Sequence, residues 1–87
     1  MSARLPELPA SVSLGLGPTI AVVRLGVRAM RAASKCERKD ATPDGLWDAV
    51  GDRILVLDSL TKRRALEVYF HELTHALVDV SNWVLHP

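Results

Sequence analysis

The chain has 87 residues and a formal net charge of +1, which allows one domain with a small core. Its single cysteine, Cys36, excludes an internal disulfide framework and fits a reducing compartment, so we expect a cytoplasmic protein or one held within a virion or other assembly. No apolar run is long enough to span a membrane, and the Lys and Arg clusters are modest. Neither a membrane nor a nucleic acid is therefore an expected partner.

The first segment, residues 1–18, contains several prolines and glycines and is predicted to be an extended arm, ordered only where something holds it. Residues 19–33 carry two overlapping patterns, one typical of a strand and one typical of a helix. A strand is favoured for the first half because of its β-branched residues and interior glycine, which are Thr19, Ile20, Val22, Val23 and Gly26.

A polar loop over residues 34–45 leads to two short apolar runs, 46–50 and 53–57, which are predicted to be strands. The pair Gly51-Asp52 between them has the composition of a two-residue turn with glycine first. The sequence therefore predicts an antiparallel β-hairpin over these residues.

A helix is predicted from about Leu60 to Val80, with Asp58 or Ser59 as its N-cap and Ser81-Asn82 as its end. One apolar stripe of this helix is expected to be buried, and it consists of Leu66, Phe70, Leu73, Leu77 and Val80. The predicted fold class is therefore α+β. It comprises a β-hairpin or three-stranded sheet packed on one long helix, with the extended N-terminal arm.

The sequence H-E-L-T-H at residues 71–75 lies within this predicted helix. His71 and His75 are one turn apart, so both imidazoles project from one face, away from the expected core stripe. This spacing allows the two rings to bind one Zn²⁺, and it places Glu72 beside the open position of the metal as a general base. The alternative is two surface or hydrogen-bonded histidines without a metal, and the presence of Glu72 favours the metal site over it.

The stretch H-E-L-T-H-A-L-V-D, residues 71–79, resembles the active-site helix of the zincin metallopeptidases and is similar to the thermolysin family. Together with Gly45-Leu46-Trp47-Asp48 and the 54–57 strand, it also resembles the short zincin-like domains of bacteria and phages. The resemblance implies a minimal zincin-like domain over residues 19–87. His71 and His75 would then be zinc ligands, Glu72 the catalytic base, and the edge strand of the sheet a cradle for an extended peptide.

The thermolysin family takes its third ligand, a glutamate, from a second helix, and no glutamate follows His75 in this sequence. His86 is the favoured substitute. If Ser81-Asn82 reverses the chain, the next four residues in an extended conformation span roughly 13 Å, which is enough to bring His86 back to the metal. Asp79 is better placed as a hydrogen-bonding partner of His75. The remaining alternatives are an upstream carboxylate, from Asp44, Asp48 or Asp58, a partner chain, a water, or no third ligand.

Two functions follow from these residues. The first is a minimal zinc-dependent metallopeptidase that hydrolyses a peptide or protein substrate with a zinc-activated water. The second is a non-catalytic module in which zinc stabilises a small fold, while the N-terminal arm docks on partner subunits of a larger assembly such as a phage particle. Three protein ligands and a water beside Glu72 would indicate the enzyme, whereas four protein ligands would indicate the structural module.

Overall fold

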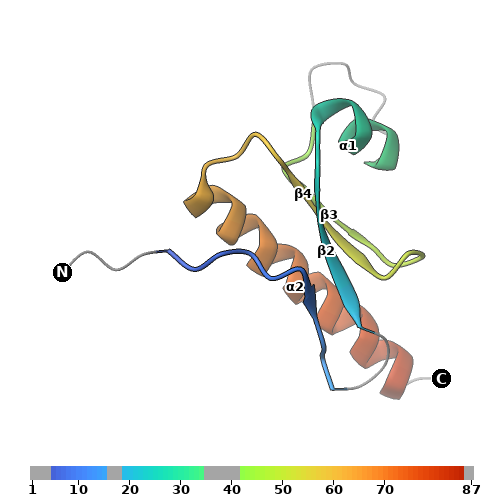
Figure 1. Cartoon of the computed structure of the whole chain (residues 1–87). Helices are drawn as coiled ribbons and strands as arrows, with labels where there is room; N and C mark the ends of the chain where they lie inside the picture. The colour runs from blue at the N-terminus through green and yellow to red at the C-terminus, as the bar shows by residue number, and fades with distance from the viewer. Residues whose placement is uncertain (1–4, 16–18, 35–41, 86–87) are drawn as a thin grey trace.

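A computed structural model describes residues 5–15, 19–34 and 42–85, with side chains as far as residue 82. Four strands form one mixed sheet in the order β1-β2-β4-β3, in which β2 is parallel to β4 and the other pairs are antiparallel (Figure 1). In chain order the elements are β1 (Ser11–Val12), β2 (Ile20–Leu25), α1 (Val27–Ser34), β3 (Gly45–Asp48), β4 (Arg53–Leu57) and α2 (Lys62–Leu85).

The predicted α+β class is confirmed, but the sheet has four strands where a hairpin or three strands were expected. The described residues also form two helices, not one. On the central strand β4, Ile54 and Val56 pack into the core beneath α2, while Leu55 and Leu57 pack with Met30 of α1. Adjacent residues of a strand point to opposite faces, so the two helices cover opposite faces of the sheet. This explains why the four residues of β4 after Arg53 are all apolar and do not alternate with polar ones.

The two patterns within residues 19–33 are both present, one after the other. The favoured strand over the first half is confirmed as β2, and the helical pattern applies to the second half as α1. Gly26 separates the two elements, and its carbonyl accepts a hydrogen bond from the backbone N–H of Met30, which is fully buried.

The predicted hairpin is present as β3 and β4, but its turn is longer than expected. The Cα partners Asp48 and Arg53 close the ladder, so residues 49–52 form the turn, and the predicted two-residue turn is wrong. The left-handed residue is Asp52 (φ 51°), since Asp tolerates this conformation. The Asp48 carboxylate stabilises the longer turn by accepting a bond from the Gly51 N–H (3.1 Å) and pairing with Arg53 (2.7 Å). Its pKa is lowered by Arg53 and then by Gly51.

Helix α2 begins later and ends later than predicted. The Thr61 hydroxyl accepts a hydrogen bond from the Arg64 N–H (3.2 Å), so Thr61 is the N-cap and neither Asp58 nor Ser59 has this role. The helix continues through Ser81-Asn82 to Leu85. Ser and Asn are common at helix ends, but neither prevents the backbone from remaining helical. The two helices do not combine the length and apolar character that a membrane crossing would need, as far as the described residues go.

The expected buried stripe of α2 is only partly correct. Leu66 is buried, but Phe70 is 57% exposed and Leu77 is 45% exposed. The face that packs on the sheet is displaced around the helix and consists of Ala65, Val68, Tyr69, Glu72 and Ala76. The two alanines on this face allow the helix to lie close to the sheet, which leaves the bulkier Phe70 and Leu77 outside.

The described part of the arm, residues 5–15, lies against the domain. Residues Ser11–Val12 pair with β2 as an edge strand, and Leu8, Val12 and Leu14 pack against the core beneath α2. The Glu7 carboxylate is paired with Lys62 at 2.7 Å, which lowers the pKa of this carboxyl. These contacts supply the support that an extended segment needs to be ordered.

Candidate metal centre

The two histidines of the motif project from one face of α2 into solvent. Their Nε2 atoms are 3.1 Å apart, and their rings lie nearly perpendicular with centroids 4.7 Å apart. The expectation that both rings lie outside the packed face of the helix agrees with their exposure. Because His71 and His75 are one turn apart, this proximity follows from helix geometry alone.

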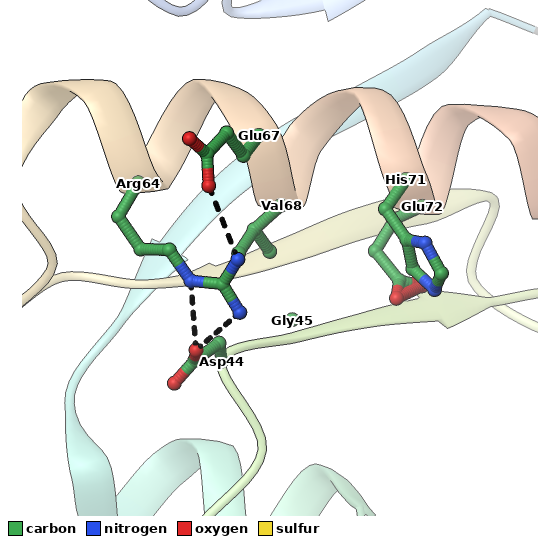
Figure 2. Close-up of a pocket in the computed structure, with 7 residues that line it drawn as sticks. All are labelled: Asp44, Gly45, Arg64, Glu67, Val68, His71 and Glu72. Atoms are coloured by element: carbon green, nitrogen blue, oxygen red, sulfur yellow. Dashed lines mark hydrogen bonds and ion pairs between the residues drawn. The ribbon is translucent and has the colours of Figure 1, made fainter.

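Glu72 lies between this exposed face and the sheet. Its side chain is only 9% exposed, yet its carboxylate and the two imidazoles offer ligand atoms that all lie within 4.8 Å of one another. Figure 2 shows the Glu72 carboxylate next to the imidazole of His71, on the side of α2 that faces β3. The carboxylate oxygens are not among the buried polar atoms that lack a partner, so solvent or a ligand can reach them.

Gly45, the first residue of β3, determines how closely α2 approaches the sheet at this point. A Cβ at this position would lie 2.2 Å from Val68 Cγ1 and 3.2 Å from Glu72 Cγ. Real Cβ atoms are not found at the shorter distance, so any larger residue would displace the helix. No role of Gly45 in positioning Glu72 was predicted from the sequence.

Trp47 joins β3 to α2 on the other side of the centre. Its indole Nε1 donates a hydrogen bond to Asp79 Oδ2 at 3.1 Å. Asp79 was expected to be a partner of His75, whereas the partner that the structure gives it is Trp47. This bond attaches the part of α2 after His75 to the edge strand β3. Because adjacent residues of a strand point to opposite faces, Trp47 points towards α2 while Leu46 points to the other face of the sheet.

A hollow of about 380 Å³ lies beside the histidine-glutamate cluster, towards the N-terminus of α2. Its lining consists of Asp44, Gly45, Arg64, Glu67, Val68, His71 and Glu72 (Figure 2). Arg64 crosses one end of it, with Nη2 2.9 Å from Asp44 Oδ2 and Nη1 3.3 Å from Glu67 Oε2. These two carboxylates, Asp44 first, raise the pKa of the guanidinium. Of the three charged residues at this end of the hollow, only Asp44 was considered as a site residue from the sequence, and Arg64 and Glu67 were not.

The structure does not supply a third metal ligand from the upstream carboxylates considered above. Asp44 is bonded to Arg64, Asp48 is paired with Arg53, and the Asp58 carboxylate lies beside Gly26. Within the described ranges, the group of potential ligands contains His71, Glu72 and His75 alone. His86, the favoured third ligand, lies outside the described residues.

The donor set and its geometry fit a zinc ion. Two imidazole nitrogens that bind one zinc at about 2.0–2.1 Å lie about 3.3 Å apart when the angle at the metal is tetrahedral. The observed separation of 3.1 Å is close to this value, and in the absence of a metal it is also a hydrogen-bond distance between the two rings. Exposure of both rings also leaves room for further ligands on the solvent side, as a catalytic site requires.

We compared the chain with models of known protein families, with curated proteins and with solved structures, and none of these comparisons found a match. The function is therefore inferred from the residues of the site itself.

Proposed function

We propose that this chain is a minimal zinc-dependent metallopeptidase of the zincin type. The observation that carries the proposal is the cluster itself, in which two exposed imidazoles have Nε2 atoms 3.1 Å apart beside a nearly buried carboxylate. The helix that carries these groups lies over β4 and the edge strand β3, an arrangement that places the cluster at the rim of the sheet. A cytoplasmic or assembly-bound location, inferred from the single cysteine, remains part of the proposal.

Each residue of the cluster has a specific task. His71 and His75 would hold Zn²⁺, and the ion would supply a Lewis acid that polarises a carbonyl and lowers the pKa of a water. Glu72 would accept a proton from the attacking water and return it to the leaving amine. Gly45 holds Glu72 at the correct depth by allowing α2 to approach β3.

The free edge of β3 is suited to bind the peptide backbone. The Leu57 N–H donates to the Asp44 carbonyl, so residues 44, 46 and 48 are the ones that bond to β4. By alternation, the N–H and C=O groups of Gly45 and Trp47 point away from β4. An extended substrate is therefore expected to add to this edge as a further strand, with its backbone bonded to Gly45 and Trp47 beside the cluster.

The third protein ligand in this proposal is His86. It is the only other histidine in the sequence, and imidazole is the commonest metal-binding side chain. A His86→Ala variant should bind zinc at least about tenfold more weakly, the scale found even for loss of a group that supports a ligand. Unchanged affinity would assign the third position to a carboxylate, a water or a partner chain.

Zinc content and peptide hydrolysis, measured on the same preparations, test the main proposal. The wild type should bind one zinc per chain and cleave unstructured peptides, and the double variant His71→Ala/His75→Ala should lose both properties. Glu72→Gln should retain zinc but lose hydrolysis by at least about a hundredfold, the scale of general-base catalysis. Zinc bound by the double variant in the same ratio would refute the proposed site.

A non-catalytic, zinc-stabilised interaction module is the second candidate function. It is favoured by the outer face of α2, where Phe70, Leu77 and Val78 are exposed and suited to contact partner subunits. In this case the wild type would bind zinc and lose thermal stability on chelation, but it would not cleave peptides. Glu72→Gln would then be indistinguishable from the wild type in every assay.

A further inference from the structure

A regular stripe of exposed residues runs along the outward face of α2. Its members follow one another at spacings of four, three and four residues, and they are Phe70, Thr74, Leu77 and Ser81. Alternating steps of four and three are the spacing of the contact positions in a pair of helices. The two apolar members, Phe70 and Leu77, are 57% and 45% exposed, and Val78 beside them is also exposed. This outward stripe therefore has the spacing of a helix-pairing surface, and the described part of the chain leaves it uncovered.

The outward stripe carries no charge. The ionisable residues of α2 over the same length lie at other positions around the helix, and they are His71, Glu72, His75 and Asp79. A surface that meets a copy of itself across a two-fold axis brings residues near their own equivalents, so a charged stripe would repel itself whereas an uncharged one does not. A charged partner surface would lose its hydration against the stripe without gaining an ion pair. The chemistry of the stripe therefore fits a second copy of this chain.

Thr74, in the middle of the stripe, can be buried without losing a hydrogen bond. Its hydroxyl donates to the Phe70 carbonyl of the preceding turn at 3.0 Å, within the helix itself. Covering Thr74 with another helix therefore leaves no unpaired donor. Its methyl group then adds apolar surface between Phe70 and Leu77. The polar member at the centre of the stripe is thus compatible with a helix-helix contact.

The charged residues near the start of α2 favour an antiparallel pair. Arg63 and Glu67 continue the four-three spacing towards the N-terminus of the helix, and both are exposed. In a parallel pair each would meet its own equivalent, which is a contact between like charges. In an antiparallel pair centred on Thr74, Glu67 lies opposite Ser81. Arg63 then lies opposite the end of α2, where the last carbonyl groups carry partial negative charge.

We propose that two copies of this chain pair through the outward stripes of α2, antiparallel across a two-fold axis at Thr74. The stripe from Phe70 to Ser81 is about 17 Å long, which makes a small interface with an expected dissociation constant of about 10–100 µM. In dilute protein the chain is therefore a monomer. Val68, which approaches β3, is two residues from Phe70 and so lies about 200° around the helix. The pair therefore leaves the β3 edge of each copy open.

Sedimentation equilibrium of the full chain with a chelator present tests the pairing independently of zinc and of hydrolysis. Between about 1 µM and about 1 mM the wild type should pass from monomer to dimer. Thr74→Glu and Thr74→Lys should each weaken the dimer at least about tenfold, because two like charges then face each other at the axis. An equimolar mixture of these two variants should dimerise again. Circular dichroism should show that both variants retain the helix content of the wild type.

Val50→Glu is the matched control. It places the same charge on an apolar residue that is 98% exposed in the turn between β3 and β4, and it should leave the dimer unchanged. A wild type that stays monomeric at about 1 mM would overturn the proposal and leave the stripe to a different partner. Dimers that persist in Thr74→Glu, or that the mixture with Thr74→Lys does not restore, would also overturn it.

Disulfide trapping tests the direction of the pair. In a Cys36→Ser background, a chain with Glu67→Cys and a chain with Ser81→Cys should form a linked dimer when mixed and mildly oxidised, because these positions are opposite each other in the antiparallel pair. Neither variant alone should link to itself. Self-linking of Ser81→Cys in preference to the mixed product would indicate a parallel pair, and the absence of any linked product at about 1 mM would reject the contact.

Discussion

The face of α2 that lies on the sheet differs from its outward face in the kind of side chain that each presents. The sheet-facing side has two alanines, Ala65 and Ala76, together with Val68, Tyr69 and the carboxylic acid Glu72. The outward side has Phe70, Leu77 and Val78, all exposed. Burial in this helix is therefore decided by how closely the backbone approaches the sheet, and not by the size of the apolar residues. The same close approach places Glu72 beside the histidines.

The largest expected effect on stability is the difference between alanine substitutions of two adjacent aromatic residues, one on each face of α2. Tyr69→Ala should lower the free energy of unfolding by about 3 kcal/mol, because it removes a ring that is 5% exposed and leaves a cavity in the core. Phe70→Ala should cost less than about 1 kcal/mol, since this ring is 57% exposed. Denaturant titration of the two variants measures both values. A larger loss for Phe70→Ala would show that the outward face is covered in solution.

A second change tests the close approach itself. Gly45→Ala should destabilise the protein by about 2 kcal/mol, since the added methyl group meets Val68 and α2 must move. If the proposed function holds, hydrolysis should fall further than stability does, because Glu72 moves with the helix. The control is Gly26→Ala, whose added methyl group meets only Asp58 Oδ2 at 3.7 Å and should cost much less. Equal losses of stability and hydrolysis in the two variants would show that the close approach of α2 at Gly45 does not position the site.

A smaller effect is expected at the bond between β3 and α2. Trp47→Phe keeps most of the ring but removes the donor to Asp79, which should cost about 1 kcal/mol because the carboxylate is left partly buried without this partner. Adding Asp79→Asn to Trp47→Phe should cost little more, and a double-mutant cycle by thermal unfolding gives the coupling between the two residues. Additive losses would show that the bond contributes no stability.

The smallest effect is a dependence on alkaline pH. Tyr69 is the only tyrosine, and its burial raises the pKa of the phenol above the ordinary value of about 10. The stability linked to this shift is complete below pH about 10 and is lost as the pH rises from there through the folded-state pKa. Near-ultraviolet absorbance should show tyrosinate forming at higher pH in the folded protein than in denaturant. Tyr69→Phe should lack both signals, and coincident titrations would contradict burial of the hydroxyl.

The sequence by itself determined the features that depend on local geometry. The four-residue spacing of His71 and His75 places them close together on one helix face. The apolar run at 53–57 predicts a strand whatever its neighbours in the sheet are. The α+β class and the strand in the first half of residues 19–33 were predicted in the same way, from β-branched residues and periodicity. None of these features requires knowledge of what the elements pack against.

The tertiary structure decided the features that depend on packing partners. The buried face of α2 could not be derived from hydrophobicity, because the missing side chain of Gly45, far away in the sequence, determines which helical residues approach the sheet. The hairpin turn was longer than its Gly51-Asp52 composition suggested, since Asp48 bonds to both Gly51 and Arg53. Likewise, Asp79 obtained Trp47 as its partner, and Asp44, in the loop before β3, was brought to Arg64 and Glu67 of α2. Long-range contacts of this kind leave no periodic signal in a single sequence.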